Sequence, residues 1–179
     1  MLAADEYDPD FGVLLRVLTA TGARRGEVCG LRWSDIKLDE GSMAIRRSVA
    51  TVAGGTVEKD TKTHAARRIA LDEATIAVLR NHRRRMDERA VVALTELDPK
   101  AFVFTESADG AKPLHPDSIT GAFRRLCKRA GLTGVRLHDL RHFHATQLLA
   151  AGVPVVTVSG RLGHANASTT LNVDRRAHV

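Results

Sequence analysis

The chain has 179 residues, of which 44% are hydrophobic and 27% charged, so it can bury one core of ordinary size and is expected to form a single domain over 1–179. Aromatic residues make up only 4%, which leaves Leu, Val, Ala and Ile to build the core and favours helices over a large β-sandwich. The net charge of +6 favours a polyanionic partner such as nucleic acid, although a surplus of this size is also common in proteins without one.

Cysteine spacing and hydropathy argue against a metal-binding, disulfide-linked or membrane protein. Cys29 and Cys127 have no spaced His or Cys partners, which predicts two reduced core thiols. No apolar run approaches the roughly 20 residues that a membrane span needs, and the N-terminal segment MLAADEYDPD is acidic. We therefore expect a cytoplasmic protein without membrane contact.

The first part of the chain is predicted to form two helices. An Asp-Pro start signal and apolar residues at helical spacing predict a helix over about 9–21, which Gly22 interrupts. A second, shorter helix is expected from Arg24 or Arg25 to about Leu31, before a turn leads into β structure.

A small antiparallel sheet of three strands is expected next. Residues 43–48 and 66–71 alternate imperfectly between apolar and polar side chains, and Gly54-Gly55 between them is a turn signal. Further helices are predicted over about 72–94, 116–130, 139–151, 154–162 and 167–174, with 102–105 as an apolar link. The fold class is therefore mainly α with a small antiparallel β-sheet (α+β).

Two segments carry groups that can bind an anion. In TGARRGE, Arg24 follows a glycine break at a helix start, where backbone N–H groups and a guanidinium can face an anion together, but an Arg-Arg pair there is more often a solvated surface. In LHDLRHFHAT, His138 and Arg141 are three residues apart and share one helix face, which combines an acid/base group with an anion clamp. Alone, a pair of this kind is more often a polar helix face.

Taken together, four segments resemble the successive sequence boxes of the tyrosine recombinase (phage integrase) family. They are TGARRGEVCGLRWSDI, TKTHAARRIAL, LHDLRHFHAT with LLAAGVP, and RLGHANASTTLNV, in the family's order and over nearly the whole chain. The resemblance implies the DNA breaking-rejoining fold of a recombinase catalytic domain. It also implies site-specific integration or recombination of DNA, by strand cleavage and rejoining through a 3′-phosphotyrosyl intermediate.

The resemblance assigns roles residue by residue. Arg24 and Arg141 match the pair that grips the non-bridging oxygens of the scissile phosphate, and His138 and His164 complete the pocket. Glu27 matches an acidic position that supports the first arginine without touching DNA.

A lysine completes the implied chemistry. Lys62 matches the lysine that protonates the departing 5′ oxygen, with Lys59 as the alternative. Two fixed guanidiniums can stabilise the charge that in-line attack builds on a phosphodiester, and lysine and histidine can move the protons, so we expect neither a metal nor a cofactor.

The nucleophile position departs from the family pattern. The family's tyrosine lies just beyond the LGH…TTL segment, where this chain carries Asp174, and the only tyrosine, Tyr7, lies in no recognisable motif. A carboxylate is shorter and would form a labile acyl linkage to DNA. We expect the chain to bind DNA but to fail at covalent cleavage, with Asp174 either near the two arginines or in a frayed terminus.

The resemblance to the family also implies binding partners, and it leaves alternative functions to be weighed. The resemblance implies double-stranded DNA and further recombinase subunits on paired sites as partners, and we expect the family's usual N-terminal core-binding domain to be absent. The alternatives are a non-cleaving DNA-binding module of the same fold, a type IB topoisomerase-like enzyme and a helix-turn-helix regulator, the last of which gives no reason for Lys62 on a hairpin.

The sequence also predicts which side chains are buried in one helix and which basic segments lie on the surface. The helix after Asp139 should be buried through its apolar residues, namely Leu140, Phe143, Leu148 and Leu149, while His138 and Arg141 line an accessible cleft. Basic segments at 62–68, 83–85 and 124–129 offer phosphate contacts, although 83–85 is better explained as a solvated helix face.

Overall fold

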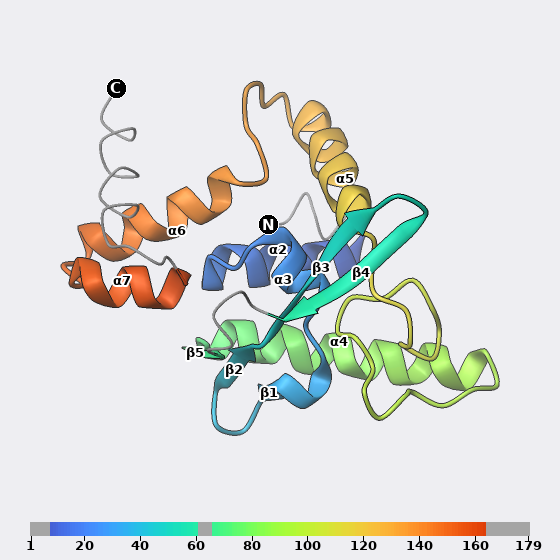
Figure 1. Ribbon diagram of the computed structural model, residues 1–179. Coiled ribbons are helices and arrows are strands. Elements are labelled where there is room, and N and C mark those ends of the chain that lie inside the picture. Colours follow the sequence, from blue (N-terminus) through green and yellow to red (C-terminus); the bar gives the residue numbers. More distant parts are fainter. Residues whose placement is uncertain (1–7, 61–65, 164–179) are drawn as a thin grey trace.

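The computed structural model describes residues 8–60 and 66–163, and helix α2 (Pro9–Thr21) lies in the middle of the molecule (Figure 1). Asp8 caps its N-terminus, and Gly22 ends it with a left-handed φ of +63°. A Cβ atom at Gly22 would lie only 2.6 Å from Leu162, so the chain needs glycine here for both its conformation and its packing. The helix predicted over 9–21 is confirmed.

The short helix α3 (Arg25–Cys29) packs directly on a β-hairpin of β3 (Arg47–Val52) and β4 (Gly55–Asp60). A Cβ atom at Gly26 would lie 2.5 Å from the carbonyl oxygen of Val49, so glycine allows this close approach. The hairpin crosses the front of the molecule in Figure 1 and reaches towards α5 (Pro116–Arg129). Helix α3 is therefore fixed between α2 and the hairpin.

The β structure differs from the prediction in its pairing. Strands β1 (Ile36–Lys37), β2 (Ser42–Ile45) and β5 (Arg67–Ala70) form an antiparallel sheet in the order β1-β2-β5. The predicted strand over 43–48 is divided between this sheet and the separate hairpin, and the Gly54-Gly55 turn belongs to the hairpin. Alternation could not show the division, because β2 is buried on both faces while β3 runs out to an exposed tip.

The remaining helices follow the predicted ranges. Helix α4 (Glu73–Val92) is capped by Asp72 and crosses beneath α2 in Figure 1, while α6 (Asp139–Ala150) and α7 (Val155–Leu162) form a pair on the other side of α2 from α5. A short 3₁₀ turn, η1 (Trp33–Asp35), precedes β1. The helix predicted over 167–174 lies outside the described residues.

One apolar core joins these elements around α2. Its fully buried members include Leu14, Val17, Val28, Leu79 and Ile119. Cys29 and Cys127 are both buried and free, which confirms the prediction of core thiols, and burial raises the pKa of Cys29 to about 12. A smaller cluster of Ala145, Val158 and Leu162 holds α6 to α7.

Candidate active site

The first candidate residue, Arg24, is held at the N-terminus of α3 by the buried carboxylate of Glu27. The backbone N–H of Arg24 donates to Oε2 of Glu27 at 2.7 Å, and its Nη1 donates to Oε1 at 3.0 Å. The Arg24 side chain remains 46% exposed. Glu27 thus supports the arginine from behind, as the sequence predicted, and the outer side of the guanidinium faces solvent.

The second candidate residue, Arg141, is buried in the first turn of α6. Its Nη1 donates to the carbonyl oxygen of Gly22 at 2.5 Å and its Nη2 to that of Leu162 at 2.7 Å. Burial, and then the positive charge of Arg24, lower the pKa of Arg141 to about 10. The guanidinium is therefore still charged near neutral pH, and it is anchored to the ends of α2 and α7.

The predicted burial pattern of α6 is wrong. Phe143 is 54% exposed, and Leu140, Leu148 and Leu149 are only partly buried, whereas the fully covered side chains are Arg141, His144 and Ala145. This polar face turns inwards because the carbonyl groups at the ends of α2 and α7 require hydrogen-bond donors. The apolar periodicity of α6 could not show those partners.

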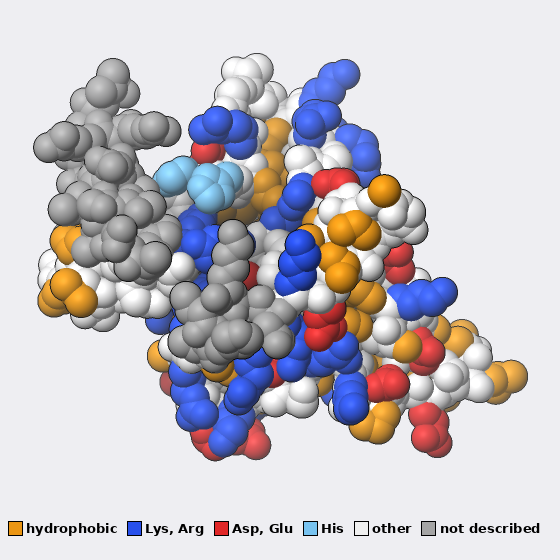
Figure 2. Space-filling model, viewed as in Figure 1, with side chains coloured by type: hydrophobic (Ala, Val, Ile, Leu, Met, Phe, Trp, Pro, Cys, Tyr) orange, Lys and Arg blue, Asp and Glu red, His pale blue; other side chains and the backbone are white. Residues whose placement is uncertain are grey.

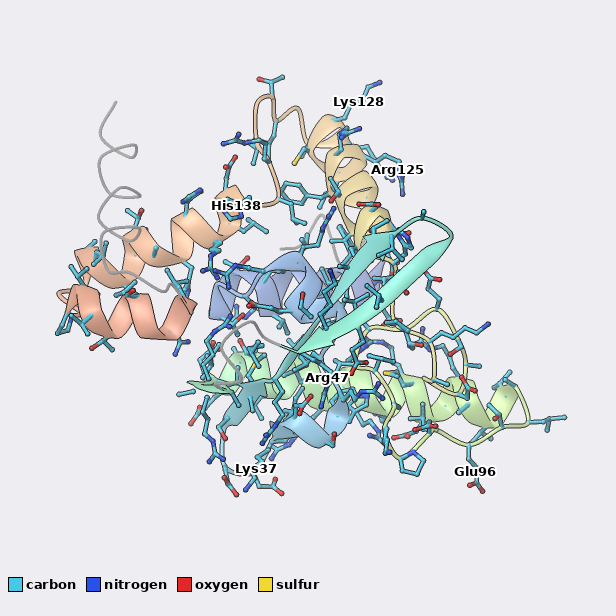
Figure 3. The ribbon with its side chains drawn as sticks, viewed as in Figure 1. Lys37, Arg47, Glu96, Arg125, Lys128 and His138 are labelled. Carbon is cyan, nitrogen blue, oxygen red and sulfur yellow. The ribbon has the colours of Figure 1, made fainter. Side chains whose placement is uncertain are left out.

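His138 lies at the α5 side of the fold, at the start of α6 (Figure 3). Its ring is exposed and packs edge-on against His142, with the ring centroids 4.6 Å apart. Partial burial, then the charges of His142 and Arg141, lower the pKa of His138. The neutral ring is therefore favoured at neutral pH and can accept a proton.

These three side chains line one cleft of about 400 Å³ between α2, α3, α5 and α6. The basic residues on its walls are Arg24, Arg25, Arg124, Arg136, His138 and Arg141. Figure 2 shows Lys, Arg and His side chains next to one another on this face. The cleft is therefore a basic site in which one anion can meet two guanidiniums and an imidazole.

Besides Arg24, two other wall arginines make ion pairs. Arg25 lies 3.0 Å from Asp117 on α5, and Arg136 lies 3.2 Å from Asp139. These pairs are exposed and hold the walls of the cleft without closing it.

Other predicted site residues are not brought to this cleft by the described structure. Lys62, His164 and Asp174 lie outside the described residues, as does Tyr7. Lys59, the alternative to Lys62, lies on β4 opposite Ser48, is exposed and does not line the cleft.

The basic segments separate into different kinds of surface. In the segment 83–85 each arginine has an acidic partner, which confirms that it is an ordinary helix face: Arg83 with Asp87, Arg84 with Glu88 and Arg85 with Asp10. In the segment 62–68, Arg67 was expected to reach phosphates but instead pairs with Glu27, and its side chain is only 14% exposed. No local sequence pattern points to this role, because Glu27 lies 40 residues away along the chain.

In the described part of the chain, no group of His, Cys, Asp or Glu side chains is placed to hold a metal ion. None of the helices in 8–60 and 66–163 combines the length and apolar character needed to cross a membrane.

The sequence profile described as the phage integrase family matches residues 6–176. The chain is similar to a XerC-like tyrosine recombinase of Caldanaerobacter subterraneus subsp. tengcongensis, with 31% identity over 167 residues that cover 86% of this chain and 42% of the relative. It is similar to the ICEBs1 integrase of Bacillus subtilis, with 27% identity over 164 residues that cover 91% of this chain and 44% of that protein. The chain thus spans less than half the length of these relatives.

Solved structures give the same fold. The Tn1549 transposon integrase in complex with transposon right end DNA superposes with a TM-score of 0.76 at 22% identity, over 93% of this chain and 56% of that one. The XerA recombinase superposes with a TM-score of 0.71 at 24% identity, over 96% of this chain and 54% of that one. The predicted fold class, mainly α with a small antiparallel sheet, is confirmed.

Proposed function

Because the chain belongs to the phage integrase family, we propose that it is the catalytic domain of a site-specific tyrosine recombinase that acts on double-stranded DNA. The observation that carries the proposal is the meeting of Arg24, His138 and Arg141 on one cleft, from two segments far apart in the sequence. The similar Tn1549 integrase was solved on transposon DNA, which supports duplex DNA as the partner.

In the proposed reaction the two guanidiniums bind the non-bridging oxygens of one phosphodiester. Arg24 approaches from α3 with its exposed side, and Arg141 is fixed by the carbonyl oxygens of Gly22 and Leu162. As a nucleophile attacks in line, negative charge grows on those oxygens, and preorganised cations stabilise that charge most. His138, favoured in its neutral form, can take the proton of the attacking hydroxyl.

We assign the remaining roles by the family pattern. Lys62 would protonate the departing 5′ oxygen, and His164 would bind the phosphate beside the arginines. Residue 174 would supply the nucleophile in the form of a tyrosine, which attaches the 3′ phosphate to the protein and releases the 5′ hydroxyl. Asp174 stands at this position, so the chain as given is proposed to hold the phosphate without forming a lasting bond to it.

This aspartate favours a second candidate function, a DNA-binding module that occupies sites without cutting them. An Asp174→Tyr variant separates the two candidates. It should form a covalent adduct with a pool of nicked, randomised duplexes, detected as labelled DNA that stays with the protein in detergent. The unsubstituted chain should form none.

Matched controls locate the chemistry in the cleft. Adding Arg141→Gln to Asp174→Tyr should remove the adduct while leaving a folded protein that still binds DNA through its other basic surfaces. An adduct with the unsubstituted chain, or a tyrosine variant that binds the pool but never attaches to it, would refute the assignment of residue 174.

A further inference from the structure

Arg67, on β5, has its hydrogen-bonding groups directed at two parts of the candidate site. Its Nη1 and Nη2 donate to the two carboxylate oxygens of Glu27 at 2.9 and 2.6 Å. Its Nε donates to the carbonyl oxygen of Arg161 in α7 at 2.9 Å. This bidentate fork, with a third donor to another element, is a geometry that only arginine provides.

The carboxylate of Glu27 is thereby shared between Arg67 and Arg24. Burial alone raises the pKa of Glu27, but the hydrogen bonds and charge of Arg67, followed by those of Arg24, outweigh burial and hold this pKa below its usual value. A buried carboxylate with Arg24 as its sole guanidinium partner would draw that side chain into a full bidentate pair. Because Arg67 takes the bidentate position, Arg24 gives Glu27 one side-chain nitrogen and keeps its outer side exposed.

Arg67, Arg24 and the second candidate residue Arg141 all donate hydrogen bonds to the C-terminal end of α7. The carbonyl oxygens of residues 161, 162 and 163 accept hydrogen bonds from Arg67 at 2.9 Å, Arg141 at 2.7 Å and Arg24 at 3.2 Å, respectively. These carbonyl groups form the negative end of the helix and satisfy each guanidinium on its inner side. Within 8–60 and 66–163, Glu27 is the one carboxylate that bonds to these three guanidiniums, which leaves a net charge of two positive units there and suits a phosphate that gains negative charge as it reacts.

We propose that Arg67 is a positioning residue for the phosphate site: it saturates Glu27 so that Arg24 stays available to the DNA, and it fixes the end of α7 against the same carboxylate. The inference rests on the proposed function for its use in DNA binding. It needs no contact between Arg67 and the DNA.

The first test is a double-mutant cycle on DNA affinity with Arg67→Lys and Arg24→Gln. Lysine keeps the charge but cannot form the fork, so Arg67→Lys should weaken binding of a short labelled duplex roughly tenfold near 0.1 M salt, about as much as Arg24→Gln, with the salt slope smaller by about 1. Added to Arg24→Gln, it should have no further effect. An equal loss in both backgrounds would overturn the proposal, because Arg67 would then act on the DNA or on folding and not through Arg24.

Arg80→Lys is the matched control, because Arg80 is 54% exposed and lies 2.7 Å from Asp39, so that its acidic partner is not Glu27. It should bind as the unsubstituted protein does. If Arg67→Lys does not fold, the pair Glu27→Gln with Arg67→Met removes both charges together and avoids a buried unpaired ion. That variant should bind DNA more tightly than Arg24→Gln, because no carboxylate is left to draw Arg24 away from the DNA, and an affinity as low as that of Arg24→Gln would overturn the proposal.

A crystal structure of the Arg67→Lys protein separates this proposal from the proposed function. Arg24 should turn inwards and pair with both oxygens of Glu27, whether or not the protein binds DNA. Arg24 in its present position would refute the role of Arg67. Absence of DNA binding by the unsubstituted protein would refute the proposed function alone.

Discussion

The two candidate arginines differ in what their guanidiniums can still do. Arg141 is buried and uses two nitrogens on carbonyl oxygens, so its position is fixed before any ligand arrives. Arg24 is half exposed and rests on Glu27, so it can adjust to a phosphate. Under the proposed function, a fixed cation beside an adjustable one suits a site that must first admit a long, rigid duplex and then hold one phosphate closely.

His144 illustrates how a single buried residue makes stability depend on pH. It lies on the inner face of α6, where Nε of Arg161 points at its Nε2 at 3.1 Å. Burial, then the positive charge of Arg161, lower the pKa of His144 from 6.5 to about 4. The folded protein therefore resists protonation of this ring while the unfolded chain takes up the proton.

We predict that His144→Gln flattens the acid dependence of stability. The unfolded chain binds the extra proton between about pH 6.5 and pH 4, so the wild-type free energy of unfolding should fall by on the order of 3 kcal/mol across that window as the pH is lowered. Glutamine can still accept a hydrogen bond from Arg161 but does not titrate. Urea unfolding across this pH range measures the difference, and equal pH slopes for the two proteins would contradict the assignment.

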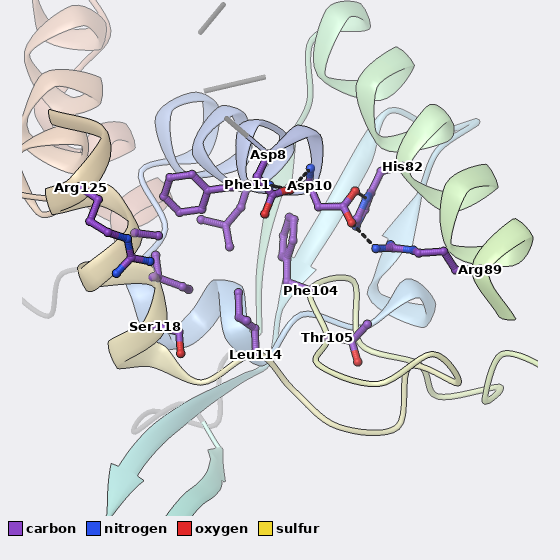
Figure 4. Close-up of a pocket in the computed structure, with 13 residues that line it drawn as sticks. Asp8, Asp10, Phe11, His82, Arg89, Phe104, Thr105, Leu114, Ser118 and Arg125 are labelled. Atoms are coloured by element: carbon purple, nitrogen blue, oxygen red, sulfur yellow. Dashed lines mark hydrogen bonds and ion pairs between the residues drawn. The ribbon is translucent and has the colours of Figure 1, made fainter. Parts of the chain in front are cut away.

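At the scale of elements, α2 and α4 are joined through one carboxylate, Asp10. Its oxygens accept from Nη2 of Arg85 at 3.0 Å and Nη1 of Arg89 at 2.5 Å, and Oδ1 lies 3.0 Å from Nδ1 of the buried His82. Figure 4 shows Arg89 reaching Asp10 beside His82. Burial alone raises the pKa of Asp10, but His82 and then the arginines outweigh it and lower this pKa strongly.

We predict that Asp10→Asn lowers the free energy of unfolding by about 2 to 3 kcal/mol at neutral pH, because it leaves Arg85 and Arg89 without their anion beside a buried histidine. The folded pKa is depressed, so the contribution of Asp10 is complete above the pKa of the unfolded carboxyl and is lost as the pH falls through the folded value. The stabilities of the two proteins should therefore converge in strong acid.

Asp87→Asn is the control: it removes an exposed pairing with Arg83 in α4 and should lower the free energy of unfolding by less than about 0.5 kcal/mol. Equal losses from the two substitutions would show that Asp10 does not join the helices.

The sequence predicted elements well wherever the signal was local. Asp8, Gly22 and Asp72 mark helix ends by their own side chains or conformation, and the helices begin and end there. Strand pairing was predicted less well, because 43–48 is one continuous stretch whose two halves pair with different partners. Likewise, the segments that carry Arg24, His138 and Arg141 could be recognised, but the inward turn of Arg141 and the fork of Arg67 depend on Gly22, Leu162 and Glu27, which no local pattern connects.

At the scale of the whole molecule, the location of cationic side chains without an acidic partner matters more for anion binding than the net charge does. The net charge of +6 is carried partly by arginines that already hold acidic side chains, including those of 83–85. Under the proposed function, such pairs would release few counterions on DNA binding, because their charge is already compensated. The cleft is different, because Arg124 exposes its guanidinium on one wall and Arg24 shares the single negative charge of Glu27 with Arg67.

We predict, on the proposed function, that the salt dependence of DNA binding identifies the cleft as the phosphate-binding surface. Each phosphate contact contributes about 0.9 to the slope of log affinity against log salt concentration. Arg124→Gln should therefore make the slope smaller by about 1 and weaken binding of a short duplex of any sequence to a similar degree.

Arg84→Gln is the control, because it removes the same charge from α4, where Arg84 lies 3.9 Å from Glu88, and it should leave the slope unchanged. The pair of variants has the same net charge, so a difference between them reports position alone. Fluorescence anisotropy titrations over a range of salt concentrations measure both slopes, and equal slopes for the two variants would mean that DNA is held by the overall charge of the chain and not by the cleft.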